Sequence, residues 1–125
     1  MSEQETRQVV DAFFTAFNRM DGDAIRATLH FPHVMIAGVN VILTQKPDDF
    51  FDLTPRRAER EGWHHSGMDA LEAVQSSEDK VHFLIEFSRY RADGFRYARY
   101  KGLWILSRVN GRWGIQARSI FPPAG

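Results

Sequence analysis

The stretch NGRWGIQARSI, residues 110–120, ends the run of strands that decides the fold. Asn110-Gly111 is a strong hairpin-turn signal, and the residues after it alternate between two faces of a strand. One face carries Trp113, Ile115, Ala117 and Ser119. The other face carries Gly114, Gln116, Arg118 and Ile120. The first face is the more apolar, so the orientation of Gln116 and Arg118, toward solvent or into a pocket, becomes the central question.

Three more strand candidates lie between Gly62 and this stretch, separated by turn signals at 76–79, 92–94 and 110–111. Residues 80–91 alternate regularly. One face of that strand carries Val81, Phe83, Ile85 and Phe87, and Arg89 has the same parity. The pattern predicts a meander of four long antiparallel strands.

Upstream of Gly62 the periodicity is helical. Val10, Phe13, Phe14 and Phe17 fall on one stripe of a first helix that ends near residues 18–20. Either Asp21 or Asp23 can cap a second helix. Residues 33–45 predict a short hairpin around Gly38, and a third helix is expected from Pro47 to Glu61, kinked or restarted at Pro55. The order predicts an α+β fold of one domain over residues 1–125, with helices on one face of a curved sheet.

Composition excludes several classes of protein. Sixteen basic residues balance sixteen acidic ones, so we expect no nucleic-acid partner. The absence of cysteine excludes disulfides and a thiolate nucleophile. We expect no membrane span, no signal peptide, no cofactor and a cytoplasmic location. His30 with His33 and His64 with His65 do not supply three ligands, so we expect no metal site and read His30 and His33 as exposed loop residues.

The stretches VVDAFFTAFNRMDGDAIRATL (9–29), HFPHVMIAGV (30–39), FSRYRADG (87–94) and GRWGIQARSIF (111–121) resemble the NTF2-like superfamily, also called SnoaL-like or cystatin-like. The resemblance implies a cone-shaped α+β barrel, with three N-terminal helices packed on a curved, mixed or antiparallel sheet. The chain is similar to a subgroup of uncharacterised bacterial members of this superfamily. The resemblance also implies a ligand pocket inside the cone. On this basis we expect the pocket to be lined by Phe13, Phe17, Phe83, Phe87, Arg89, Gln116 and Arg118.

Ketosteroid-isomerase-like relatives use a helix-1 tyrosine, an acid after helix 2 and a second acid on a late strand. The corresponding positions here carry Phe13, Ala37 and, approximately, Ile105. None of these side chains transfers a proton, so we expect no ketosteroid-isomerase activity.

Three functions remain open. The first is binding of a small apolar molecule with a carboxylate or carbonyl end. The second is an isomerase, dehydratase or cyclase type of enzyme that uses His65 with Arg118 or Asp69; His65 and Asp69 are the catalytic candidates. The third is a dimerisation module without chemistry. A cone filled by phenylalanine side chains would favour the module.

A partly apolar second face of the sheet predicts a homodimer. The side chains expected there are Leu84, Trp104, Leu106, Trp113 and Ile115. Such a face, left bare, would exceed the apolar patches that monomers usually expose. We therefore expect two copies to meet through the sheet.

Overall fold

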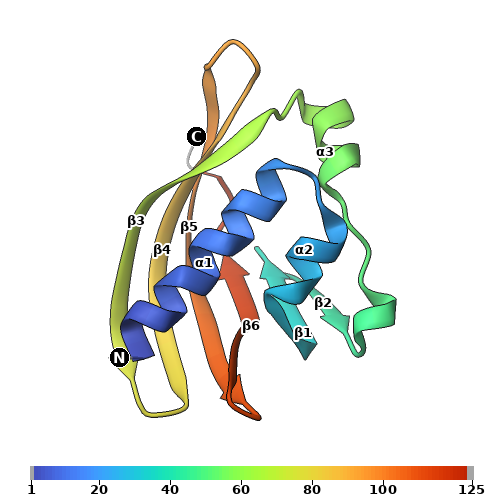
Figure 1. The fold of residues 1–125 in the computed structure, drawn as a ribbon. Helices are drawn as coiled ribbons and strands as arrows, with labels where there is room; N and C mark the ends of the chain where they lie inside the picture. Colours follow the sequence, from blue (N-terminus) through green and yellow to red (C-terminus); the bar gives the residue numbers. More distant parts are fainter. Residues whose placement is uncertain (1, 124–125) are drawn as a thin grey trace.

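A computed structural model describes residues 2–123 as helices laid over one face of a curved, open sheet (Figure 1). The helical elements are α1 (Ser2–Asn18), α2 (Gly22–Ala27), the 3-10 turn η1 (Pro47–Asp49) and α3 (Thr54–Glu61). The strands are β1 (Leu29–Ala37), β2 (Asn40–Thr44), β3 (His65–Ser76), β4 (Lys80–Tyr90), β5 (Arg96–Val109) and β6 (Arg112–Ile120). Within residues 2–123, no helix is both long and apolar enough to cross a membrane.

The sheet has six strands in the order β2-β1-β6-β5-β4-β3. All neighbours are antiparallel except β1 and β6, which run parallel. The four predicted long strands are present as β3 to β6, and the expected α+β class with a mixed sheet is confirmed. The sheet is open, because β2 and β3 are both edge strands.

Helix α1 lies across the concave face of this sheet (Figure 1). Its stripe of Val10, Phe13 and Phe14 is buried, and the Phe14 ring stacks on Trp104 of β5 at a centroid distance of 5.7 Å. The predicted inner face of β4 packs under the helix, with Phe83 fully buried. The core therefore occupies the concave side beneath the N-terminal half of α1. The C-terminal half of α1 borders a cavity.

The segment expected to form one helix from Pro47 is divided. It forms η1, an extended stretch and then α3, whose first turn contains Pro55. The Asp52 carboxylate accepts hydrogen bonds from both the backbone N–H and the hydroxyl of Thr54 at the start of α3. Gly62 ends the helix with φ of 70°, the left-handed conformation that glycine adopts most easily.

The two faces predicted for β6 are corrected by a β-bulge. Ile115 pairs with Leu106 and Ala117 pairs with Ile105, so Gln116 is the extra residue. Because one inserted residue reverses the alternation, Ile115 and Arg118 both point to the concave side. Gln116 does not: its side-chain amide donates a hydrogen bond to the Pro32 carbonyl, outside the concave face.

The apolar face of the sheet that was expected to be exposed is mostly buried. Four of its five side chains lie in the buried core: Trp104, Leu106, Trp113 and Ile115. Leu84 remains on the convex face and is 47% exposed. The apolar residues that were expected to form a dimer contact therefore form the interior of the protomer instead.

Candidate functional site

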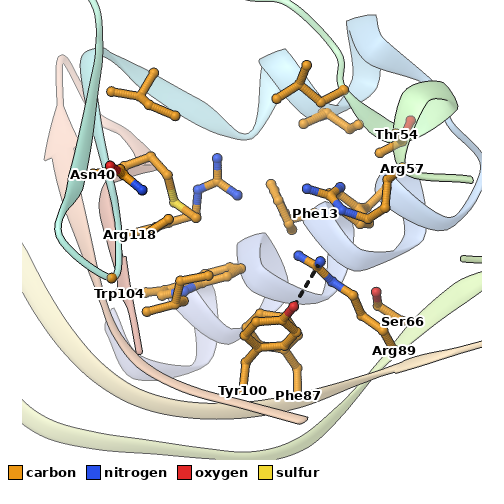
Figure 2. A pocket seen from close by; sticks show the side chains of 18 of the residues that line it. Phe13, Asn40, Thr54, Arg57, Ser66, Phe87, Arg89, Tyr100, Trp104 and Arg118 are labelled. Atoms are coloured by element: carbon orange, nitrogen blue, oxygen red, sulfur yellow. Dashed lines mark hydrogen bonds between the residues drawn. The ribbon is translucent and has the colours of Figure 1, made fainter. Parts of the chain in front are cut away.

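A cavity of about 810 Å³ occupies the concave side. Its floor comes from α1 and from the inner faces of β4, β5 and β6; α3, the β1–β2 hairpin and the loop before α3 form its other walls (Figure 2). Most of its lining is apolar or aromatic: Phe13, Phe14, Phe17, Ile25, Met35, Ile42, Phe50, Phe51, Leu53, Phe87, Trp104, Ile120 and Phe121. Three arginines from three different elements interrupt this surface: Arg57 of α3, Arg89 of β4 and Arg118 of β6.

Arg118 is positioned by a histidine. Its Nε donates to the Nε2 of His33 at 3.1 Å, while the His33 Nδ1 donates to the Ile115 carbonyl at 3.0 Å. An arginine cannot accept a hydrogen bond, so His33 is the neutral Nδ1–H tautomer. Burial, and secondarily the charge of Arg118, lower the pKa of His33 to about 4. The guanidinium also lies over the Phe13 ring, at 4.9 Å from its centroid.

Arg89 belongs to a hydrogen-bonded group with two tyrosines and one acid. Its Nη1 donates to the Tyr100 hydroxyl at 3.1 Å and, at the longer distance of 3.4 Å, to the Glu61 carboxylate (Figure 2 shows the first). Tyr97 donates to the same Glu61 oxygen at 2.7 Å. Burial first, and then this hydrogen bond to Glu61, raise the pKa of Tyr97, so the hydroxyl remains a donor.

Arg57 projects from α3 toward the other two arginines (Figure 2). Its guanidinium lies 5.3 Å from the centroid of the Phe17 ring, and its Nε is buried without a hydrogen-bond partner. Burial, followed by repulsion from Arg89, lowers the pKa of Arg57. Burial and the charges of Arg57 and Arg89 lower the pKa of Arg118 to about 10. Arginine side chains are protonated in proteins, so these three place three positive charges at one end of the cavity.

Five of the seven residues expected in the pocket lie in the cavity wall: Phe13, Phe17, Phe87, Arg89 and Arg118. Phe83 does not, because α1 covers it completely and Arg7 lies over its ring at 5.5 Å. Gln116 does not, because of the bulge in β6. Phe13 and Ala37, which occupy the positions of the isomerase groups in the resemblance, both line the cavity.

The two catalytic candidates lie away from the cavity. His65 pairs with Tyr90 across β3 and β4, and the two rings stack at 4.8 Å on the convex side. Asp69 accepts a hydrogen bond of 2.5 Å from Ser88, whose parity on β4 is opposite to that of Arg89. Neither side chain is among those that line the cavity, so the site that joined them to Arg118 is not formed.

Sequence reasoning missed Arg57, Tyr100 and His33. Arg57 was not singled out from the sequence as a site residue; it lies one turn after Leu53 on the side of α3 that faces the cavity. His33 was expected in an exposed loop and is instead 3% exposed in β1. Its parity with Met35 and Ala37, both in the cavity wall, was the available signal.

The described residues contain no cluster of metal-ligating side chains. In the part of the chain that the structure describes, no three histidine, aspartate or glutamate side chains gather closely enough to hold a metal ion. The free donors of the site are arginine N–H groups, which bind oxygen anions.

Comparison with known proteins identifies the fold and says little about chemistry. A family model described as "NTF2-like protein (DUF6841)" matches residues 3–119. A Nostoc punctiforme protein of unknown function with a cystatin-like fold is 11% identical, with a TM-score of 0.79 over 95% of this chain and 89% of that one. A ketosteroid isomerase-like protein from Erwinia carotovora atroseptica is 21% identical, with a TM-score of 0.70 over 98% and 95% of the two chains. No curated protein matches the sequence.

Proposed function

The chain belongs to the NTF2-like family DUF6841, and from that premise we propose that it binds a small molecule with an apolar, aromatic body and an anionic end. The observation that carries the proposal is the pairing of an aromatic-walled cavity with three arginines at one end. The volume of about 810 Å³ falls within the range of small-molecule sites, about 300–1,000 Å³.

The polarity of the site supports an anion rather than a neutral polar group. Arg118 uses only its Nε within the protein; among residues 2–123, no acceptor is bonded to its two terminal nitrogens. Arg118 is partly shielded from water, a cation withdrawn from water is costly unless it is paired, and a carboxylate offers planar, bidentate acceptance to a guanidinium. The aromatic rings of Phe13, Phe87 and Trp104 would then cover the apolar body of the ligand.

The open cavity favours ligand binding over the other two functions that the sequence left open. A module that only associates has no use for an unfilled cone, and here the phenylalanines line the cone without filling it. The enzyme alternative rested on His65 and Asp69, and both side chains lie on the convex side of the sheet. We therefore propose a binding protein as the primary function.

Binding of an aromatic carboxylate and its neutral amide tests the proposal. We expect 2-naphthoate to raise the thermal unfolding midpoint and 2-naphthamide, which has the same body, to do so much less. Arg118→Leu should weaken naphthoate binding by about 1–3 kcal/mol, the value of a hydrogen bond to a charged group, and should leave the fold intact.

Arg99→Leu is the matched control, because it removes the same charge from β5 at a site where Arg99 pairs with Glu86 on the convex face. Naphthoate affinity should not change in this variant. Equal affinity for the acid and the amide, or equal losses in the two arginine variants, would contradict the proposal.

A further inference from the structure

The cationic end of the cavity contains more positive charge than the protein itself balances. Three guanidinium groups meet there, and Glu61 is the one carboxylate in residues 2–123 that is hydrogen-bonded to any of them. Asp52 also lines the cavity and keeps its negative charge, but among residues 2–123 it forms no ion pair with any of the three arginines, and its Oδ1 accepts hydrogen bonds from the backbone and hydroxyl of Thr54. Because only Arg89 has an ion-pair partner, two of the three guanidinium groups, those of Arg57 and Arg118, form no ion pair within residues 2–123.

The contact between Glu61 and Arg89 is weak. Its 3.4 Å length exceeds the usual 2.7–2.9 Å of a charge-assisted hydrogen bond. The Glu61 side chain is 40% exposed, and its bonded oxygen is shared with Tyr97 at the shorter distance of 2.7 Å. A ligand oxygen could therefore replace Glu61 on Arg89 while Glu61 keeps its bond to Tyr97.

The remaining donors come from three elements, α3, β4 and β6, and point into one space (Figure 2). Arg118 is fixed by His33, Arg89 by Tyr100, and Arg57 by the ring of Phe17. Arg57 makes no side-chain hydrogen bond within the described residues, and the Nε of Arg89 is also without a partner. A multiply charged anion would relieve the mutual repulsion among the three guanidinium groups.

Resting on the function proposed above, we propose that this end of the cavity takes a group with two negative charges and oxygen acceptors only. A phosphate monoester and a pair of adjacent carboxylates share this chemistry. Two negative charges match the two guanidinium groups that form no ion pair within residues 2–123, and a singly charged group leaves one of them without an ion-pair partner. The ligand class is thus an aromatic or apolar dianion.

Four probes with a phenyl body separate charge from shape: phenyl phosphate, benzenesulfonate, phthalate and benzoate. Phenyl phosphate and benzenesulfonate are both tetrahedral oxyanions, but only the phosphate carries a second charge above a pKa of about 6. At about pH 8 we expect calorimetry to show phenyl phosphate binding at least about tenfold more tightly than benzenesulfonate, and at about pH 5 we expect the two affinities to converge.

The phthalate arm identifies the source of the two charges. Phthalate binding tighter than benzoate, with weak phenyl phosphate binding, supports adjacent carboxylates; the reverse supports a phosphate monoester. If every dianion binds no more tightly than its monoanionic counterpart, the dianion inference is overturned while the proposed function stands. If none of the four binds, both are overturned.

Glu61→Gln gives an independent test on the protein side. Because glutamine keeps a hydrogen-bond acceptor for Tyr97 but removes the competing charge, phenyl phosphate or phthalate should bind about threefold or more tightly. Glu59→Gln is the matched control: it makes the same charge change on the exposed side of α3 and should alter affinity much less. A weaker or unchanged affinity in Glu61→Gln would overturn the role given to Glu61.

Discussion

His33 meets Arg118 through the one ring nitrogen that carries no proton, and this makes the neutral state of the histidine part of the site. A second histidine, His30, meets Arg112 in the same manner farther along β1 and β6. Only the His33 pair borders the cavity, through Arg118. The orientation of Arg118 in the cavity wall therefore depends on an imidazole that does not itself line the cavity.

The pH dependence of unfolding tests the neutral imidazole. The pKa of His33 is about 4 in the folded protein against 6.5 for an unperturbed histidine, so the unfolded chain takes up its proton first. Stability should fall as pH decreases from about 6.5 to about 4, by up to about 3 kcal/mol from this group. Urea unfolding across that range measures it. His33→Gln, which does not titrate, should flatten the profile, and an unchanged profile would contradict the assignment.

At the scale of elements, strand parity was predictable and its interruption was not. The alternation of β4 correctly placed Arg89 on the concave side, because that strand pairs with β5 in regular register from Lys80 to Arg89. In β6 the bulge at Gln116 reversed the assignment for Trp113 and Ile115 while leaving Arg118 inside. Residue alternation contains no mark of the extra residue, since a bulge is selected by pairing with the neighbouring strand.

A close approach of β5 and β6 at Gly102, which pairs with Ile120, gives a prediction for the sheet. A Cβ added at Gly102 would collide with the Ser119 carbonyl oxygen and contact Ile120. Backbone atoms cannot move aside as a flexible side chain can, so Gly102→Ala should destabilise the protein by about 2–3 kcal/mol. Gly67→Ala is the control on β3, where an added Cβ meets only the edge of the Tyr90 ring at 3.4 Å, and should cost less than about 1 kcal/mol. Equal unfolding midpoints in the two variants would contradict this account.

At the scale of the whole molecule, the order of helices and strands was predictable because periodicity and turn residues are local signals. The chemistry of the site was not, because it comes from α3, β4, β5 and β6 meeting in three dimensions. Arg57 illustrates the limit: its neighbours in sequence include the charged Arg56, Glu59 and Arg60, while its neighbours in space are Phe17 and two other arginines. A residue whose partners are distant in sequence gives no local pattern to detect.

The homodimer through the sheet stays a prediction, and the structure moves its basis to different residues. The convex face carries Leu84, which pairs with the half-buried Leu103, and beside them the half-buried Ile105. These side chains form an apolar strip across β4 and β5, and pairing two such strips about a twofold axis would remove them from water.

Leu84→Glu should therefore convert a dimer to a monomer in sedimentation velocity at micromolar concentration. Circular dichroism should stay unchanged, because Leu84 is 47% exposed within a single chain. Leu43→Glu is the control, since Leu43 is similarly exposed at 54% but lies on the edge strand β2. A wild-type protein that sediments as a monomer, or a Leu84→Glu variant that remains a dimer, would exclude assembly through this strip.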